Sequence, residues 1–285
     1  MRLVTYQSES GPRVASVRGD SLVDLNQADS TLPATLKGLL GTSDGLQRAA
    51  AAAASGAAFD RIGTRLLAPV PDPGKVICIG LNYADHAAES GVEPPPEPVV
   101  FCKFPSAVCA DGDEIRLPTI SSKVDYEAEL VVVMGRGGRD IAKENALSHV
   151  AGYACGHDVS ARDWQLEKPG GQWLLGKTFD TFAPYGPELV TADEVGDPGN
   201  LAIALRLNGE TMQDSNTQQL IFAVDHLISY LSSVCTLEPG DIIFTGTPPG
   251  VGAARKPPVF LKDGDLTEVE IEKLGVLTNR VTVTG

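Results

Sequence analysis

The sequence predicts an α+β fold rich in β-strands, with a small N-terminal α/β domain ahead of a larger domain. Strand patterns dominate after residue 74, whereas clear helical periodicity occurs only in 143–150 and 218–234. A stiff, proline-rich segment, Ala68 to Gly74, separates this strand-rich part from the residues before it. We therefore expect residues 1–67 to form the N-terminal domain and residues 68–285 to form the main, catalytic domain.

The N-terminal part contains three short strand patterns and one alanine-rich helix pattern. The strands are expected at Leu3–Gln7, Arg13–Arg18 and Leu22–Leu25. The helix is expected at Leu46–Ser55, and Gly56 can end it in the left-handed conformation. This arrangement is typical of a small structural unit.

The main domain contains a series of strand patterns. These cover Lys75–Ile79, Val99–Lys103, Leu130–Met134, Ala151–Cys155, Leu201–Leu207, Asp241–Phe244, Val259–Leu261, Thr267–Ile271 and Arg280–Val283. Asn208-Gly209 predicts a tight hairpin between Leu201–Leu207 and Glu210–Gln213. Gln218–Val234 predicts an amphipathic helix.

Composition and charge exclude several classes of partner. The chain has 285 residues and a formal net charge of −14, which argues against binding to nucleic acid or to an anionic membrane. No apolar run approaches the roughly 20 residues of a membrane span, and the first residues show no signal-peptide pattern. The five cysteines form no Cys-x-x-Cys pair, so we expect buried, reduced thiols in a cytoplasmic protein.

Three acidic residues form a candidate metal site. Glu127 and Glu129 enter a strand pattern two residues apart, so their side chains point to the same face, which carries Val131 and Val133 further along. Side-by-side carboxylates need a shared proton, a basic partner or a cation, or they lie at a solvated strand end. Asp158 follows another strand pattern and supplies a third oxygen ligand. Three carboxylates favour a hard cation, Mg²⁺, Mn²⁺ or Ca²⁺, with positions left for substrate and water.

A short helix pattern at 82–91 contains a candidate general base. Asn82 can cap this helix and Gly91 can end it. His86 and Glu89 are three residues apart and share a face, so the carboxylate can fix the imidazole tautomer and raise its basicity. An exposed helix pair is the alternative. The proline-rich segment 92–98 that follows is either a lid over substrate or a connector.

Two further segments can contact an anionic substrate. Lys177 lies in a turn of small residues and can reach an anion or an enolate, or it is a surface lysine. The loop 245–252 follows a clear strand pattern, and its glycines and hydroxyls can donate to a carboxylate. The remaining histidines are expected to be structural, and Trp164 and Trp173 are expected to pack in the protein interior.

Taken together, these motifs resemble the fumarylacetoacetate hydrolase family from about Lys75 to Val281. The resemblance rests on residues 79–83 with His86 and Glu89, on Glu127 and Glu129, on 158–163, on 176–180, and on 239–241 leading into 245–252. Residues 172–177 and 255–261 resemble one branch of this family, the fumarylacetoacetate hydrolase domain-containing protein 2 branch. They also resemble bacterial hydrolases of diketo-deoxy sugar acids.

The resemblance implies a fold, a metal and roles for named residues. It implies a mixed β-roll catalytic domain, a homodimer, and Mg²⁺ or Mn²⁺ on Glu127, Glu129 and Asp158. It implies His86 with Glu89 as the base, and Lys177 acting on the substrate. The residues implied to bind substrate are Tyr83, Arg162, Gln165 and Thr247.

The family covers several reactions of small keto acids, and fold alone does not choose among them. The leading hypothesis is metal-dependent hydrolysis of a carbon–carbon bond in an acylpyruvate or β-diketo acid through an enolate. The alternatives are tautomerisation or decarboxylation of oxaloacetate and a 2-hydroxyhepta-2,4-diene-1,7-dioate-type isomerisation. A third reading is a regulatory or binding protein without catalysis.

Overall fold

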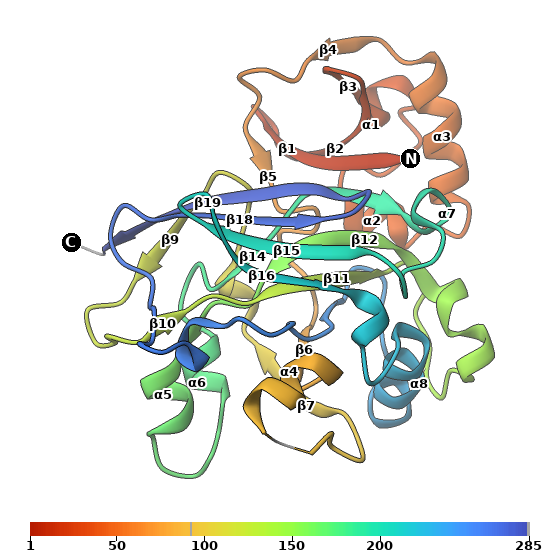
Figure 1. Cartoon of the computed structure of the whole chain (residues 1–285). Helices are drawn as coiled ribbons and strands as arrows, with labels where there is room; N and C mark the ends of the chain where they lie inside the picture. The colour runs from red at the N-terminus through yellow and green to blue at the C-terminus, as the bar shows by residue number, and fades with distance from the viewer. Residues whose placement is uncertain (92, 284–285) are drawn as a thin grey trace.

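A computed structural model of the chain describes residues 1–91 and 93–283 (Figure 1). Its large mixed sheet has twelve strands. Ten of them run in the order β4 (Ala58–Asp60), β3 (Ser21–Asp24), β2 (Gly11–Arg18), β1 (Arg2–Ser8), β14 (Ala183–Thr191), β12 (Val150–His157), β11 (Ala128–Met134), β17 (Ile242–Phe244), β6 (Val76–Gly80) and β7 (Val99–Lys103). The other two, β5 (Leu66–Leu67) and β8 (Val108–Cys109), pair with β1 and β14.

A second sheet packs against the large one. It has five strands in the order β16 (Glu210–Asn216), β15 (Ala202–Leu207), β18 (Leu266–Ile271), β19 (Gly275–Val283) and β9 (Glu114–Leu117), and β10 (Val124–Asp125) pairs with β13 (Ser160–Ala161). The helices are α1 (Leu25–Ala28), α2 (Leu36–Leu40), α3 (Gly45–Ser55), α4 (Ala84–Ser90), α5 (Arg162–Leu166), α6 (Leu174–Lys177), α7 (Ala192–Val195) and α8 (Val224–Val234). Four 3-10 turns cover Pro105–Ala107, Lys143–His149, Thr217–Gln219 and Gly252–Ala254.

Strand β11 is buried on both faces and organises the core. Leu130 and Val132 point into the hydrophobic cluster shared with the five-stranded sheet. Val131 and Val133 point into a second cluster, shared with the N-terminal helices. Because this strand is wholly inside the protein, any charged side chain at its beginning is also inside.

The N-terminal strands continue the main sheet. Strand β1 pairs with β14 through Arg2 and Val190 and through Leu3 and Leu189. Leu3 and Leu36 also share a hydrophobic cluster with Val131 of β11. In Figure 1 this region projects from one end of the molecule, joined to the rest by that strand pair. The division at residue 67 stays a prediction.

The β-rich α+β fold class is confirmed, and three local predictions are wrong. Residues 259–261 form no strand: Val259 donates to Gly252 of a 3-10 turn and Leu261 donates to Val124 of β10, without the continuous pairing of a strand. The helix predicted from Gln218 begins only at Val224, since residues 217–219 form a 3-10 turn. Gly56 ends α3 with extended backbone; its Cβ would lie 2.4 Å from Val23, so close packing explains the glycine.

The sequence analysis missed β14 altogether. Its nine residues contain Gly186-Pro187, which interrupt the strand pattern that Tyr185 and Val190 would otherwise show. The predicted hairpin is confirmed: Asn208 and Gly209 both have positive φ, and Leu207 pairs with Glu210. All five cysteines are free, but Cys102 is exposed, contrary to the expected burial.

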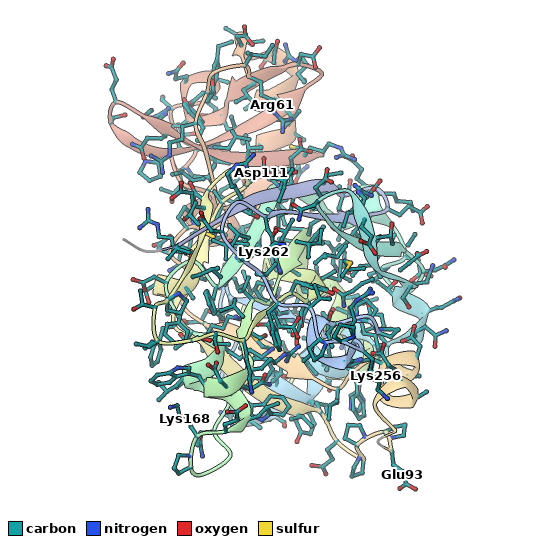
Figure 2. The ribbon with its side chains drawn as sticks, turned by 60° about the vertical axis from the view of Figure 1, so that its left-hand side comes forward. Arg61, Glu93, Asp111, Lys168, Lys256 and Lys262 are labelled. Carbon is teal, nitrogen blue, oxygen red and sulfur yellow. The ribbon has the colours of Figure 1, made fainter. Side chains whose placement is uncertain are left out.

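Labelled side chains mark the two ends of the molecule. Figure 2 places Arg61, in the N-terminal part, at one end, and Lys168 and Glu93 at the opposite end. Among the described residues, no helix is long and apolar enough to span a membrane. Of the predicted lid 92–98, residue 92 lies outside the described residues, and the others form no helix or strand.

Candidate active site

The three predicted metal ligands come together at one end of the β11–β12 pair. Glu127 immediately precedes β11, Glu129 is its second residue, and Asp158 follows the last residue of β12. Ala128 pairs with His157, so the antiparallel register brings the three carboxylates side by side. One oxygen of each lies within 4.8 Å of the others, and all three residues are buried.

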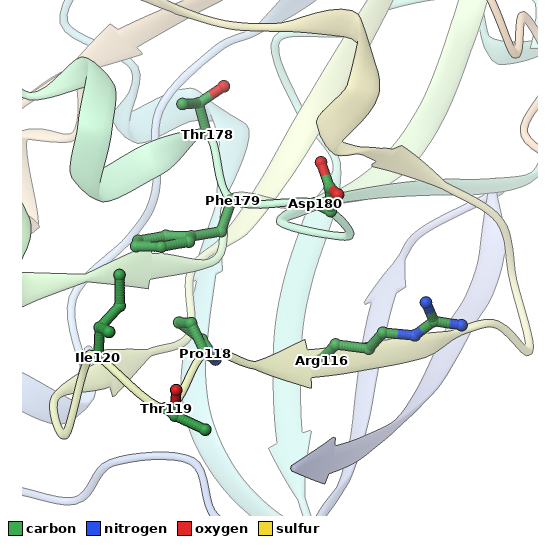
Figure 3. Close-up of a pocket in the computed structure, with 7 residues that line it drawn as sticks. All are labelled: Arg116, Pro118, Thr119, Ile120, Thr178, Phe179 and Asp180. Atoms are coloured by element: carbon green, nitrogen blue, oxygen red, sulfur yellow. The ribbon is translucent and has the colours of Figure 1, made fainter. Parts of the chain in front are cut away.

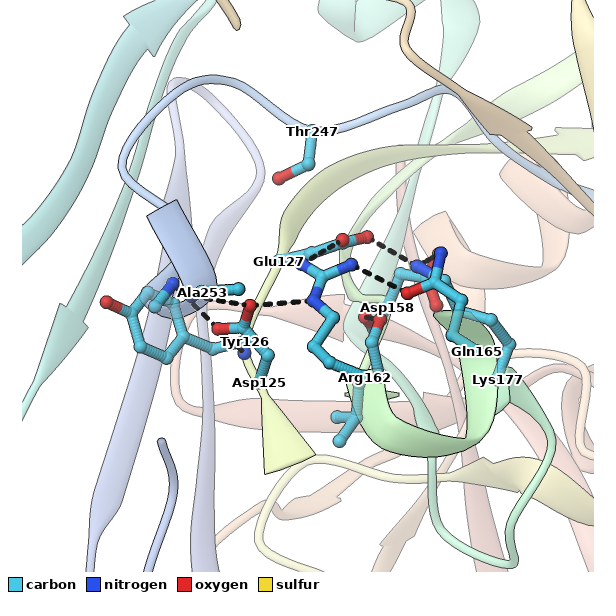
Figure 4. A network of polar contacts seen from close by, with 12 residues as sticks. Asp125, Tyr126, Glu127, Asp158, Arg162, Gln165, Lys177, Thr247 and Ala253 are labelled. Carbon is cyan, nitrogen blue, oxygen red and sulfur yellow. Dashed lines mark hydrogen bonds and ion pairs between the residues drawn. The ribbon is translucent and has the colours of Figure 1, made fainter. Parts of the chain in front are cut away.

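Two buried lysines and one half-buried arginine lie beside these carboxylates, and Figure 4 shows Arg162 and Lys177 next to Glu127 and Asp158. Arg162 lies 2.6 Å from Glu127. Lys177 Nζ lies 2.8 Å from Glu127 and 3.0 Å from Asp158. Lys103 Nζ lies 2.6 Å from the other oxygen of Asp158. The predicted alternative of a surface position for Lys177 is wrong, since its side chain is 2% exposed.

The cluster has more negative than positive charge. Asp125, bound to Arg162 at 2.8 Å, brings the carboxylates to four against three cations. Within residues 1–91 and 93–283, Glu129 has no cation partner; its carboxylate accepts one hydrogen bond, from the Gly246 amide at 2.8 Å. The unmatched charge of the cluster therefore lies on Glu129.

The pKa values of the two glutamates move in opposite directions. Burial raises the pKa of Glu129 well above its usual value, and the charges of Asp158 and Glu127 raise it further. Burial also acts to raise the pKa of Glu127, but Lys177 and Arg162 together outweigh it and lower that pKa. Glu129 is thus the carboxylate that most needs an added positive charge.

These residues fit a hard divalent cation. Asp158 Oδ1 is buried and accepts no hydrogen bond from any described residue, although Lys103 is near it. Neither oxygen of Glu129 has a cation partner among the described residues, and Oε2 accepts a hydrogen bond from the Gly246 amide. Oxygen atoms from three carboxylates form the donor set that Mg²⁺ and Mn²⁺ prefer. Glu127, Glu129 and Asp158 would hold such an ion.

Arg162 is fixed by a chain of hydrogen bonds. Its Nε donates to Asp125, and its Nη1 donates to Gln165 Oε1 at 2.9 Å. Asp125 is held in turn by the amides of Gly252 and Ala253. The guanidinium is therefore held in one orientation beside Glu127, and Gln165 turns its amide nitrogen away from Arg162.

The predicted base lies on α4, beside the carboxylate cluster. His86 Nδ1 is 3.1 Å from Glu89, as the spacing predicts. The amide of Gly250 donates to both oxygens of Glu89 at 3.1 and 3.2 Å, so this carboxylate is held from the glycine loop. Gly91 ends the helix with φ of 63°, as predicted. With Nδ1 toward Glu89, the His86 Nε2 is the free ring nitrogen.

The predicted capping role of Asn82 is wrong. The backbone of Tyr83 forms the N-cap without a side-chain hydrogen bond. The Asn82 amide donates to the carbonyls of Phe222 and Thr245 and accepts from the Phe222 amide. Asn82 therefore ties the start of α4 to the glycine loop and to the segment before α8.

Two of the residues predicted to bind substrate differ in position. Thr247 lines the pocket, and its oxygen accepts from Gln213 Nε2 at 2.8 Å, which leaves the Thr247 hydroxyl proton free to donate. Tyr83 is fully buried in the hydrophobic core and is not among the residues that line the pocket. Its hydroxyl has no hydrogen-bond partner among the described residues.

A pocket of about 170 Å³ joins the cluster to the dyad. Its polar lining includes all but three of the ten predicted residues: His86, Glu127, Glu129, Arg162, Gln165, Lys177 and Thr247. Asp158 lies beneath the floor and Glu89 behind His86. Its apolar lining is Ile79, Gly80, Leu81, Phe101, Leu166 and Trp173.

A larger pocket of about 540 Å³ lies elsewhere (Figure 3). It is lined by Arg116, Pro118, Thr119, Ile120, Thr178, Phe179 and Asp180. It contains one carboxylate and no histidine, so it offers neither a metal site nor a base. The smaller pocket is therefore the candidate active site.

Lys103 and Trp173 are the main residues that the sequence analysis missed. Lys103 ends strand β7, where a lysine is typical of a strand entering solvent, yet it is 2% exposed. It donates to the carbonyls of Val159, Lys177 and Phe182. Trp173 was expected only to pack, but its ring lines the pocket. A lysine following the apolar pattern Val99–Cys102 was the available signal for Lys103.

Comparison with known proteins gives relatives that cover the whole chain. The family model described as "Fumarylacetoacetate (FAA) hydrolase C-terminal" matches residues 75–282. The chain is 49% identical to the mitochondrial oxaloacetate tautomerase fahd2 of Xenopus laevis, over 99% of this chain and 90% of that protein. The predicted cytoplasmic location stays a prediction.

Two solved structures share the fold over full length. One is 2-hydroxyhepta-2,4-diene-1,7-dioate isomerase from Mycobacterium marinum, with a TM-score of 0.80 and 34% identity, covering 100% of this chain and 99% of that one. The other is maleylpyruvate hydrolase from Sphingobium sp. SYK-6 in complex with manganese (II) ion and pyruvate, with a TM-score of 0.83 and 33% identity, covering 100% of both chains. The chain belongs to the fumarylacetoacetate hydrolase family.

Proposed function

We propose that this protein is an oxaloacetate tautomerase that depends on Mg²⁺ or Mn²⁺. The observation that carries the proposal is the His86–Glu89 dyad beside a buried carboxylate cluster with one unmatched negative charge. The relative at 49% identity bears this name, and a structural neighbour was solved with manganese and pyruvate. The earlier hypothesis of carbon–carbon bond hydrolysis becomes the second candidate.

The floor of the pocket would bind the keto-acid end of the substrate. A divalent ion on Glu127, Glu129 and Asp158 would hold the 2-keto and carboxylate oxygens and stabilise negative charge on the former. Lys177 has three N–H donors and uses two on Glu127 and Asp158, so one can reach the substrate. Thr247 would donate to the substrate carboxylate.

The dyad would move the proton. With Glu89 accepting from Nδ1–H, His86 would present Nε2 to the substrate as the proton acceptor. Nε2 takes a proton from carbon 3, and the C–H electron pair forms the carbon 2–carbon 3 double bond. The charge moves to the 2-oxygen, which then takes the proton from Nε2–H. The overall change is an isomerisation that consumes no water.

Hydrolysis would use the same residues with one extra reactant. His86 would deprotonate a water, which would attack the distal carbonyl of an acylpyruvate, and an enolate would leave. Decarboxylation would need only the enolate. A substrate comparison separates these reactions, since they give respectively an enol, two acids, or carbon dioxide.

The test compares the wild type with His86→Ala on two substrates. We expect the wild type to interconvert the oxaloacetate forms, followed by enol absorbance, faster than it cleaves acetylpyruvate or releases carbon dioxide. His86→Ala should lose about 10²–10⁴-fold in tautomerase rate while Mg²⁺ affinity persists. His226→Ala is the matched control, because His226 lies on α8 outside the pocket lining.

Full tautomerase activity in His86→Ala would overturn the role of the dyad. Acetylpyruvate cleavage faster than tautomerisation would favour hydrolysis, and inertness toward both substrates would favour a binding protein. We also propose the homodimer that the family resemblance implies; light scattering of the purified chain measures its mass directly.

A further inference from the structure

One wall of the pocket is built from three residues of different elements: Gly80 of β6, Phe101 of β7 and Trp173 just before α6. Strands β6 and β7 are antiparallel neighbours, and Cys78 pairs with Phe101. The indole lies against both strands. This wall is apolar, whereas the floor that adjoins it contains Glu127, Glu129 and Lys177.

The indole is seated on Gly80. A Cβ at position 80 would lie 2.4 Å from Trp173 Cζ3 and 3.0 Å from Cη2, closer than any side chain allows. The indole also meets Phe101 edge-on, with the ring centres 5.5 Å apart. Phe101 in turn lies 5.0 Å from Lys177 Nζ. The wall is thus in contact with the catalytic floor.

Beyond the indole lies the protein surface. Trp173 follows residues 167–172, which are exposed and turn through Gly170 and Gly171 with φ of 89° and 60°. Leu166 and Leu175, on either side of this loop, are 63% and 53% exposed. Figure 2 shows Lys168 of the same loop at the far end of the molecule. Removing the ring would therefore open the pocket toward solvent past apolar side chains.

The pocket behind the ring is small. Its volume of about 170 Å³ is close to the roughly 150 Å³ of a cavity that takes a ligand of the size of benzene. That space suits a metal-bound keto acid of about four carbons. A longer chain attached to carbon 3 would meet the indole, because the polar floor fixes the other end of the substrate.

We propose that Trp173, held between Gly80 and Phe101, sets the length of the substrate and restricts this enzyme to short keto acids. The inference rests on the proposed function in one respect, that the 2-keto and carboxylate groups bind at the carboxylate cluster. Without the ring, the same site accepts 2-keto acids and acylpyruvates with longer apolar chains.

The test measures binding, which is independent of the reaction. Pyruvate and 2-oxooctanoate are titrated by calorimetry in the presence of Mg²⁺. The wild type should bind pyruvate at least about tenfold more tightly, and Trp173→Ala should gain at least about tenfold for 2-oxooctanoate, since added methylenes then enter apolar space. Leu175→Ala, an exposed position of α6 outside the pocket lining, should change neither affinity.

A second variant keeps the proposal falsifiable if Trp173→Ala fails to fold. In Gly80→Ala the new methyl displaces the indole, so the preference for pyruvate should change. Where Trp173→Ala does fold, Gly80→Ala/Trp173→Ala also lacks the ring, and its affinities should match those of Trp173→Ala. Thermal melting of each variant verifies folding.

Equal binding of both ligands by the wild type, no pyruvate binding, or an unchanged ratio in Trp173→Ala would overturn the inference. The proposed function can fail separately. If the wild type does not tautomerise oxaloacetate but the binding ratio shifts in Trp173→Ala, the role of Trp173 is supported and the proposed reaction is wrong. If the wild type is an active tautomerase but the ratio does not change in Trp173→Ala, the proposed reaction is supported and the role of Trp173 is wrong.

Discussion

Two buried ionic clusters in this protein resemble each other in chemistry and differ in charge balance. In the N-terminal part, Asp24 accepts from Arg13 at 2.5 and 2.6 Å and from the Tyr6 hydroxyl at 2.6 Å. One carboxylate there meets one cation. In the active site, four carboxylates meet three cations, and Glu129 has no cation partner in the described chain.

The difference separates a structural cluster from a ligand site. Burial acts to raise the pKa of Asp24, but the Arg13 and Tyr6 hydrogen bonds outweigh it and lower that pKa. The pKa of Glu129 is raised instead. A cluster with equal numbers of negative and positive charges does not require a bound ion, whereas a cluster with excess negative charge favours binding of a proton or a metal ion. Four substitutions test this contrast.

Lys103→Met should cause the largest effect. It removes a cation from a cluster already short of one, breaks the ion pair with Asp158, and leaves three carbonyls without their donor. We expect the free energy of unfolding, measured with urea, to fall by about 3–5 kcal/mol. Lys168→Met, at an exposed lysine, is the control. Added Mg²⁺ should recover part of the loss; a loss below about 1 kcal/mol would show that Lys103 does not neutralise the cluster.

Glu129→Gln should have opposite effects on metal binding and on stability. The variant loses a metal ligand, so Mg²⁺ affinity by calorimetry should fall at least about 100-fold, beyond the range expected of a residue outside the ligand set. Without metal, the free energy of unfolding should stay equal or rise, because repulsion from Asp158 and Glu127 disappears. Glu127→Gln, which takes one of two carboxylate partners from both Arg162 and Lys177, should instead destabilise the protein.

The carboxylates of the site could be predicted because their signal is local. Glu127 and Glu129 share a strand face by alternation, and His86 and Glu89 share a helix face by spacing, so neither inference needs the tertiary structure. The meeting of Asp158 with this pair depends on the pairing of β11 with β12. For that step the family resemblance supplied what periodicity could not.

The residues that escaped prediction owe their roles to non-local contacts. Lys103 is buried because β7 lies beside the end of α6 and the turn after β12, and nothing in Val99–Lys103 encodes that neighbour. Asn82 looked like a helix cap, but its partners Phe222 and Thr245 are more than 100 residues away. Strand β14 was hidden by Gly186-Pro187, and its place between β1 and β12 is set by tertiary pairing.

Asp24→Asn should destabilise the protein, in contrast with Glu129→Gln. Arg13 would lose its counter-charge while the hydrogen-bonding shape persists, so we expect a loss of about 1.5–3 kcal/mol at pH 7. The loss should depend on pH. Because the folded pKa of Asp24 is lowered, its stabilisation is present above the unfolded pKa of about 3.9 and is lost as pH falls through the folded value. Urea unfolding at pH 7 and below pH 4 should show the two proteins converging in acid.

Tyr6→Phe should have the smallest effect on the free energy of unfolding. It measures how much the Tyr6 hydrogen bond, as distinct from the Arg13 ion pair, stabilises the N-terminal cluster. The Tyr6 hydroxyl donates to Asp24, and burial followed by that carboxylate raises the pKa of Tyr6 to about 12, so the proton stays in place at neutral pH. Losing this bond while Arg13 keeps Asp24 paired should cost about 1 kcal/mol. In the Asp24→Asn background the same change should cost less, since the acceptor is no longer charged. Equal costs in both backgrounds would mean that the charge of the Asp24 carboxylate adds nothing to the strength of this hydrogen bond.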